Sequence, residues 1–329
     1  MARVFIGIPT LNRPELVRET VRSVIAQTFT DWRAIVSDNV SAGDAAERVR
    51  RWVEELGDPR VTFHQQAENG GEYGQGRFFF ARAGGEEHLV IVHDDDVLKP
   101  GFISAAVEAL AANPGAAFFV CNPWILAEDG SRRDDFTRRF DECWGRTGVR
   151  EGLIDVLDTH MRTGFTPISG AVFRMAALRD SGFVDDDLFG CFPFESNVFL
   201  RLGERGAKAW FTPRRLFGLR WHSQQMINWG FLNDEEIVSS TIRLFERRRF
   251  KGDNERKRRQ LLGRLHRVGA LHRARAGDLP GARRAAVAAI RANPASLKTW
   301  VVGPAALVAP SLVGAVVRAH FSPRMFASC

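Results

Sequence analysis

The chain has 329 residues, of which 45% are hydrophobic and 26% charged, and this suffices for one large α/β domain with an appendage or for two domains. The formal net charge is +7, and basic residues gather between 247 and 275, where they could meet nucleic acid, an anionic membrane surface or solvent. Four scattered cysteines without a C-x-x-C pair argue against a structural zinc site, and with the lack of a signal-peptide pattern they favour a cytoplasmic protein.

The first part of the chain alternates between short β-type runs and helical patterns. Pro9 ends the first apolar run, and Pro14 suits the first turn of the helix that follows. In order, the sequence predicts a strand at 4–8, a helix from about residue 15, a strand at 32–36, a helix at 45–56, a strand at 61–63, a glycine-rich loop at 68–76, a helix at 78–83 and a strand at 89–92. This alternation indicates a parallel, doubly wound sheet.

The strand predicted at 89–92 stops abruptly at His93 and three consecutive acids, Asp94, Asp95 and Asp96. Adjacent carboxylates repel one another, so burying them without partners is unfavourable. Because ligands of open α/β sheets sit at the carboxyl ends of the strands, we expect these acids to face a divalent cation. The alternative is a solvated acidic turn that precedes the next helix.

The remainder of the chain is predicted to be less regular and to end in helices. The predicted elements are a helix at 100–112, strands at 116–121 and 168–173, a helix at 192–203, a strand at 209–211, a long basic helix at 234–250 and a helical pair at 271–294 that is broken at 277–280. Residues 300–317 carry no charge, but two prolines and two glycines disfavour a straight helix across a membrane.

Six segments follow one another along the chain: IGIPTLNRPELVRETVRSVIAQTF, IVSDN, ENGGEYGQG, HDDDVLKPGF, GCFPFESNVFLRLGERG and LRWHSQQM. In this order they resemble the family 2 glycosyltransferases, inverting enzymes of the GT-A fold that use nucleotide-diphosphate sugars. The resemblance covers roughly residues 3–230. It implies an α/β protein with a Rossmann-like, mostly parallel sheet in a catalytic domain at 1–232, followed by a basic helical region at 233–329.

The resemblance also implies which residues bind the donor nucleotide. An arginine near the end of the first strand offers a planar, permanent charge to a diphosphate, and an acid at the end of the second strand can accept hydrogen bonds from base or ribose. An ordinary turn, a helix N-cap and a solvated helix arginine are the alternatives for these positions. The implied donor-binding residues are Pro9, Thr10, Asn12, Arg13, Asp38, Asn69, Arg77 and Asp94.

The acidic run matches the metal-binding motif of the family, with Mn²⁺ or Mg²⁺ as the expected ion. Asp94 and Asp96 fit a D-x-D pattern, whereas aligning His93 with the first acid of the family motif makes Asp95 central. We favour Asp95 and Asp96 and keep all three as candidates. His222 matches a late family histidine that supports the metal or the diphosphate.

The inverting reaction requires a base that takes the proton of the acceptor hydroxyl. In the family an acid at this position precedes an arginine by six residues, and Glu195 precedes Arg201 by six. The usual residue is aspartate, so this chain departs from the family pattern. The alternative for Glu195 is a glutamate that stabilises a helix N-terminus.

The expected activity is transfer of a sugar to an acceptor hydroxyl of a cell-envelope glycan, a lipid-linked intermediate or another glycoconjugate. A nucleotidyltransferase acting on sugar phosphates and a non-catalytic protein that binds sugar nucleotides are the alternatives. No nucleic-acid module is recognisable, so nucleic acid is not an expected partner. The basic region and residues 300–317 add the hypothesis of peripheral contact with the inner face of the cell membrane.

Overall fold

The computed structural model describes residues 3–163, 168–221, 235–297 and 300. The chain divides into two compact units, residues 1–222 and 223–329. Each unit is described by itself. The boundary near residue 232 that the family resemblance implies remains a prediction.

Within the described part of the first unit, nine strands form one mixed sheet with the order β3-β2-β1-β4-β8-β6-β9-β5, and β7 pairs with β9. The first four strands in this order are parallel, and β8 joins them to the parallel pair β6 and β9 through antiparallel contacts. The strands are β1 (Val4–Thr10), β2 (Trp32–Asp38), β3 (Val61–Gln65), β4 (His88–Ile91), β5 (Val97–Leu98), β6 (Ala116–Leu126), β7 (Gly152–Asp155), β8 (Ala171–Arg174) and β9 (Lys208–Arg220).

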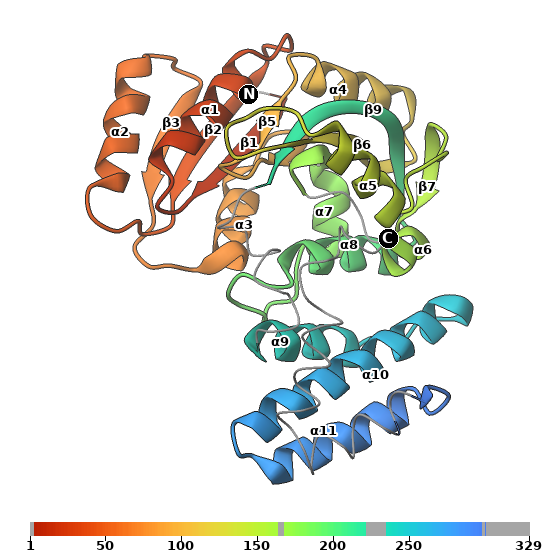
Figure 1. The fold of residues 1–329 in the computed structure, drawn as a ribbon. Helices are drawn as coiled ribbons and strands as arrows, with labels where there is room; N and C mark the ends of the chain where they lie inside the picture. Colours follow the sequence, from red (N-terminus) through yellow and green to blue (C-terminus); the bar gives the residue numbers. More distant parts are fainter. Residues whose placement is uncertain (1–2, 164–167, 222–234, 298–299, 301–329) are drawn as a thin grey trace. The chain divides into compact units, whose positions relative to one another are not determined.

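Helices pack against this sheet and bury its apolar strands. Val4, Phe5 and Ile6 of β1 are fully buried, as the apolar run predicts. Figure 1 shows α1 and α2 alongside β1, β2 and β3. The helices of the unit are α1 (Pro14–Ile25), α2 (Ala45–Leu56), α3 (Gly71–Arg82), α4 (Phe102–Ala112), α5 (Asp134–Cys143), α6 (Val156–Thr163), α7 (Met175–Ser181) and α8 (Phe194–Glu204). The predicted α/β class with a mostly parallel sheet is confirmed.

The glycine-rich segment 68–76 is not a loop throughout, because α3 already begins at Gly71. Gly71 has φ +61° and its Cα lies so close to Gly190 that an added Cβ would be 2.4 Å from the Gly190 carbonyl carbon. At Gly76 an added Cβ would meet the ring of Phe194 at 2.3 Å. These glycines allow α3 to pack closely against the segment before α8 and against the first residue of α8, and this packing was not predicted from the sequence.

Three further elements differ from the sequence prediction. Residues 168–170 form a short 3₁₀ turn, η1 (Ile168–Gly170), so only β8 of the predicted strand 168–173 is extended. The short strand predicted at 209–211 extends over the whole of β9. The long helix predicted at 234–250 ends at Glu246, and a separate helix follows it.

The second unit contains α9 (Glu235–Glu246), α10 (Gly252–Arg275) and α11 (Leu279–Ala292) in its described part. α10 and α11 form the predicted helical pair: Gly277 has φ +81°, and Asp278 Oδ1 accepts a 2.8 Å bond from the N–H of Gly281 at the start of α11. The predicted C-terminal helical extension is confirmed. Among the described helices, none is both long and apolar enough to cross a membrane. Residues 301–317 of the uncharged stretch lie outside the described residues.

Candidate active site

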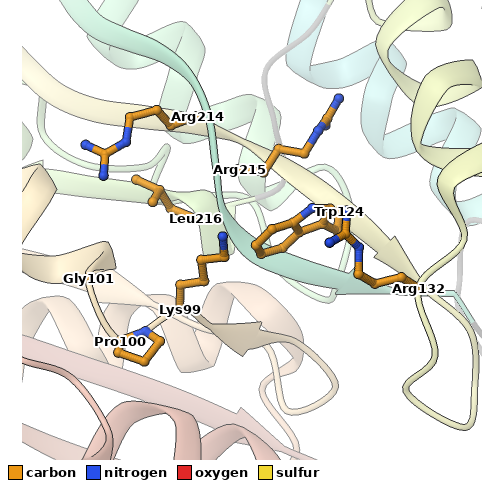
Figure 2. Close-up of a pocket in the computed structure, with 8 residues that line it drawn as sticks. All are labelled: Lys99, Pro100, Gly101, Trp124, Arg132, Arg214, Arg215 and Leu216. Atoms are coloured by element: carbon orange, nitrogen blue, oxygen red, sulfur yellow. The ribbon is translucent and has the colours of Figure 1, made fainter.

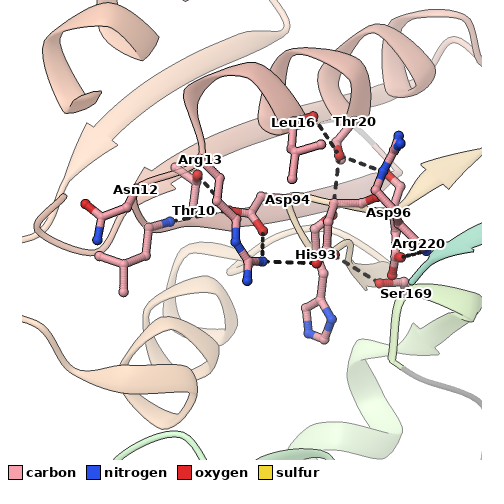
Figure 3. Close-up of polar contacts among 12 residues, drawn as sticks. Thr10, Asn12, Arg13, Leu16, Thr20, His93, Asp94, Asp96, Ser169 and Arg220 are labelled. Carbon is pink, nitrogen blue, oxygen red and sulfur yellow. Dashed lines mark hydrogen bonds and ion pairs between the residues drawn. The ribbon is translucent and has the colours of Figure 1, made fainter. Parts of the chain in front are cut away.

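A buried run of acids follows β4, which lies between β1 and β8 in the sheet (Figure 3). Asp94, Asp95 and Asp96 are 5%, 6% and 0% exposed. Burial and the charge of Asp95 raise the pKa of Asp94 to about 6 and the pKa of Asp96 to about 7. Crowded, buried acids lower the stability of the fold, and such groups are typical of a functional site.

The turn between β1 and α1 holds Asp94. The Thr10 hydroxyl donates a 2.8 Å hydrogen bond to Asp94 Oδ2, and Arg13 Nη1 lies 3.0 Å from both Asp94 Oδ1 and Asp95 Oδ2 (Figure 3). The structure therefore brings three of the predicted donor-binding residues together. The guanidinium of Arg13 is partly exposed beside these acids, so it is also accessible to an anionic ligand.

Three residues of this run could hold a metal ion. His93, Asp95 and Asp96 each offer one ligand atom, and these atoms lie within 4.8 Å of one another. Asp96 Oδ1 accepts a 3.1 Å bond from the backbone N–H of Arg220, and the Ser169 hydroxyl beside the carboxylate lowers its pKa. Asp96 Oδ2 is buried and has no hydrogen bond within 3.5 Å among the described residues. A buried oxygen in that state is unfavourable unless a cation or another donor satisfies it. The donor set fits a divalent metal, and it does not include Asp94.

Arg220, at the end of β9, fixes the backbone of the acidic run. Its side chain is 2% exposed and donates from Nε to the carbonyl of Asp95 at 3.0 Å and from Nη2 to Glu19 Oε2 at 2.5 Å. The hydroxyl of Thr20 in α1 donates to the Asp96 carbonyl at 2.7 Å. Residues from α1 and β9 thus set the orientation of the candidate ligands, a common arrangement around metal sites.

Glu195 lies in the first turn of α8 and faces the acidic run. Its Oε1 accepts a 3.1 Å bond from the N–H of Ile168 and lies 3.7 Å from His93 Nε2. The side chains of Glu195 and His93 are 30% and 28% exposed, so a solute can reach both. The candidate base and the candidate metal ligands therefore share one accessible site.

A second glutamate, Glu72 on α3, belongs to the same electrostatic cluster. Burial raises the pKa of Glu72 to about 8, with repulsion from Glu195 adding to the effect, and burial likewise raises the pKa of Glu195. Burial alone would lower the pKa of His93, but Glu195 and Glu72 raise it to about 9. A protonated His93 between the two glutamates stabilises their charged forms.

Other predicted donor-binding residues lie along the carboxyl ends of β1 and β2 and at the start of α3. Asp38 is 0% exposed and accepts 2.9 Å and 2.5 Å bonds from the backbone N–H and the hydroxyl of Ser41. Asn12 Oδ1 accepts from the Ala42 N–H at 2.7 Å, and Asn69 Oδ1 accepts from Asn39 Nδ2 at 2.9 Å. These side chains lie along one edge of the sheet, and their contact with a nucleotide remains a prediction. Pro9 is half-buried in β1, and its contact with a nucleotide also remains a prediction.

Arg77 makes its hydrogen bonds to the backbone of the segment before α8. Its Nη2 donates to the carbonyls of Asp185, Asp186 and Leu188 at 2.9, 3.2 and 2.7 Å. Its guanidinium also lies 5.1 Å from the ring centroid of Phe189. In this arrangement Arg77 ties α3 to the segment that leads to Glu195, and binding of the diphosphate by Arg77 remains a prediction.

Sequence reasoning did not assign roles to Glu72 and Arg220, and it considered His93 only as an alignment position. Both unassigned residues fall inside quoted segments, ENGGEYGQG and LRWHSQQM, but nothing in either segment points to the acids. His222, the expected late metal or diphosphate residue, lies outside the described residues.

The family model of glycosyl transferase family 2 matches residues 5–183, more than half of the chain, so the protein belongs to this family. Solved structures confirm the GT-A fold. TarS 1–349 of S. aureus in complex with UDP-GlcNAc aligns with a TM-score of 0.61 at 12% identity, over 99% of this chain and 91% of that one. The mannosyltransferase PcManGT from Pyrobaculum calidifontis, in complex with GDP-Man and Mn²⁺, gives 0.57 at 18% identity, over 99% and 86%.

Curated relatives are similar over shorter stretches. The putative colanic acid biosynthesis glycosyl transferase WcaA of Escherichia coli is 27% identical over 122 residues, 37% of this chain and 43% of that protein. The GalNAc(5)-diNAcBac-PP-undecaprenol beta-1,3-glucosyltransferase of Campylobacter jejuni is 28% identical over 138 residues, 42% of this chain and 43% of that protein. The matched stretch is thus less than half the length of either relative.

Proposed function

We propose that this glycosyltransferase moves a sugar from a nucleotide-diphosphate donor to an acceptor hydroxyl in a metal-dependent reaction with inversion at the anomeric carbon. The observation that carries the proposal is the position of Glu195, with Oε1 3.7 Å from His93, beside a run of buried acids at the carboxyl end of β4. A base and a set of oxygen and nitrogen ligands side by side are what this reaction requires.

Asp95 and Asp96 would hold the metal, joined by His93 once it has lost its proton and become a neutral imidazole, and His222 is a further proposed ligand. The metal supplies charge neutralisation on the diphosphate leaving group. Between the two expected ions, Mn²⁺ accepts a nitrogen ligand such as His93 more readily than Mg²⁺ does. Both oxygens of Asp94 already bind Thr10 and Arg13, so we assign Asp94 to fixing the β1–α1 turn rather than to the metal.

The donor nucleotide is proposed to lie along the carboxyl edge formed by Pro9, Thr10, Asn12, Asp38 and Asn69. Arg13 is placed to contact the diphosphate, because its guanidinium is partly exposed above the acids. Glu195 takes the proton of the acceptor hydroxyl as the oxygen attacks the anomeric carbon from the face opposite the leaving group. An α-linked donor therefore gives a β-linked product.

Donor hydrolysis and transfer test the proposal directly. Full-length protein would be incubated with UDP-GlcNAc or GDP-mannose and Mn²⁺, with and without excess EDTA, and released nucleotide measured. We expect turnover that EDTA abolishes, and NMR of the product should show inverted configuration. Undiminished turnover in EDTA, or a retained configuration, would contradict the proposal. A nucleotidyltransferase would instead release pyrophosphate from a nucleoside triphosphate and a sugar phosphate, and a non-catalytic protein would bind donor without turnover.

For the acceptor we infer a cell-envelope glycan or a lipid-linked intermediate. Support comes from the two bacterial relatives, whose names refer to colanic acid and to an undecaprenol-linked glycan. The proposed location is the cytoplasm, with peripheral contact to the inner face of the membrane through the basic region at 233–329.

A further inference from the structure

A second pocket lies on the catalytic unit and contains none of the active-site residues. It is open, has a volume of about 590 Å³, and is formed by the chain after β5, the end of β6, the segment before α5 and the middle of β9 (Figure 2). Its cationic lining residues are Lys99, Arg132, Arg214 and Arg215, and Trp124 lies among them. No acidic side chain lines the pocket within the described part of the chain.

An irregularity in the sheet produces this arrangement. The pairing of β6 with β9 passes from Cys121 opposite Thr212 to Asn122 opposite Arg215, so two extra residues of β9 bulge out at this point. Successive residues of a regular strand point to opposite faces, whereas a bulge re-aims its side chains. Arg214 and Arg215 both border the pocket beside this bulge, and Figure 2 shows their side chains extending to opposite sides of β9.

Trp124 positions two of the cations without neutralising them. Lys99 Nζ lies 3.8 Å from the centroid of the indole, and the guanidinium carbon of Arg132 lies 4.8 Å from it. Figure 2 shows both side chains extending to the ring. Contact with an aromatic face attracts a cation but leaves its full charge available to a ligand.

The charges of the pocket do not balance. Arg132 lies 3.2 Å from Asp134, and Arg215 forms an ion pair with Asp141. Among the described residues, no carboxylate lies within ion-pair distance of Lys99 or Arg214. Four cationic side chains against two carboxylates leave two positive charges, which equals the charge of a phosphate dianion.

We propose that this pocket binds the phosphate group of a ligand other than the donor nucleotide. Arginine and lysine together provide directed, charge-assisted hydrogen bonds to phosphate oxygens, and the volume is in the usual range for small-molecule sites. The phosphate can belong to a soluble sugar phosphate, which carries two negative charges, or to a lipid headgroup, which carries one when it is a phosphodiester; both present phosphate oxygens to the cations. Lys99, which lines this pocket, follows Asp96 by three residues in the sequence. Binding of phosphate in the pocket does not depend on the proposed reaction.

Fluorine NMR of the full-length protein tests the proposal at Trp124 itself. The eight tryptophans would be replaced by 5-fluorotryptophan, and the Trp124 resonance assigned through its loss in Trp124→Phe. Titration with inorganic phosphate in EDTA should shift this resonance in a saturable way. In the double variant Lys99→Gln, Arg214→Gln the dissociation constant should rise about tenfold or more.

The matched control is Arg51→Gln, Arg256→Gln, which removes the same charge from two exposed arginines elsewhere. It should titrate like the wild type. A Trp124 resonance that phosphate does not move, or equal affinity in the pocket variant and the wild type, would overturn the proposal. Glucose 6-phosphate and phosphatidylglycerol vesicles then identify the source: the pocket variant should lose binding to one of them relative to the control, and loss of neither would also overturn it.

Discussion

At the scale of single residues, the buried carboxylate of Asp96 destabilises the metal-free protein. The pKa of Asp96 is raised to about 7, whereas the pKa of an aspartate in an unfolded chain is about 3.9. Between these values the folded protein binds the proton and the unfolded chain does not, so the stability of the metal-free protein falls as pH rises through this window. We therefore predict that Asp96→Asn raises the melting temperature of the metal-free protein at pH 8 and has a smaller effect at pH 4.

The same variant should lose Mn²⁺-dependent donor binding and turnover, because an amide is a weaker ligand than a carboxylate. Thermal unfolding in EDTA and donor titration with Mn²⁺ measure the two effects. Asp31→Asn, which changes an exposed carboxylate, is the control and should alter neither. A lower melting temperature of Asp96→Asn at pH 8 would show that the carboxylate stabilises the empty site.

Glu195 is predicted to act on the acceptor and not on the donor. Glu195→Gln keeps the size of the side chain and its acceptor for the Ile168 N–H, but it cannot take a proton. We expect kcat to fall by about 10²-fold or more, with little change in the dissociation constant of the donor. Steady-state kinetics and isothermal titration measure these quantities.

Glu72→Gln is the comparison, since Glu72 belongs to the same cluster and also raises the pKa of His93. It should change the pH dependence of turnover more than its maximum. If Glu72→Gln abolishes turnover while Glu195→Gln remains active, the assignment of the base to Glu195 is wrong.

At the scale of secondary structure elements, α3 depends on close contact with the segment before α8. Gly71→Ala would place a Cβ 2.4 Å from the backbone of Gly190, at a φ of +61° that alanine disfavours. We predict a large loss of stability, about 2 kcal/mol or more from strain and overpacking together. Turnover should fall as well, because the displaced segment leads to Glu195.

Gly74→Ala is the matched control in the same helix, since an added Cβ would meet nothing within 4 Å. It should stabilise the protein by up to about 1 kcal/mol through higher helix propensity. Chemical denaturation of both variants checks the pair. Similar free energies of unfolding for the two variants would contradict the role assigned to the contact with Gly190.

At the scale of the whole molecule, the chain divides into two compact units, and the described catalytic residues all lie in the first. A fragment of residues 1–232 is predicted to bind the donor with Mn²⁺ as the full chain does. Basic residues near an anionic membrane contribute about 1 kcal/mol each, so the full chain should sediment with anionic vesicles at low salt and dissociate as salt rises. The fragment, which lacks the basic region, should sediment less than the full chain.

Co-sedimentation with phosphatidylglycerol and phosphatidylcholine vesicles measures this prediction, and the neutral vesicles are its control. A full-length protein that stays in solution with both at low salt would contradict membrane contact. A fragment that sediments as strongly as the full chain would assign the contact to the catalytic unit.

The sequence alone determined the features that depend on neighbouring residues. The alternation of apolar runs and helical patterns predicted β1 to β4 with α1 and α2, because side-chain periodicity reflects which face of an element is buried. The end of β4 at three acids identified the candidate metal site. The break at Gly277 and Asp278 predicted the α10–α11 pair, and the order of the six segments indicated the family that the comparison then confirmed.

Only the tertiary structure decided which distant side chains meet. His93 and Glu195 are 102 positions apart and come within 3.7 Å because the first turn of α8 lies beside the residues that follow β4. Glu72 joins them only because α3 begins at Gly71 and not seven residues later. The bulge of β9 at Arg214 depends on the register with β6, which no local pattern specifies. Contacts of this kind arise from packing between elements, and a single sequence carries no separate signal for them.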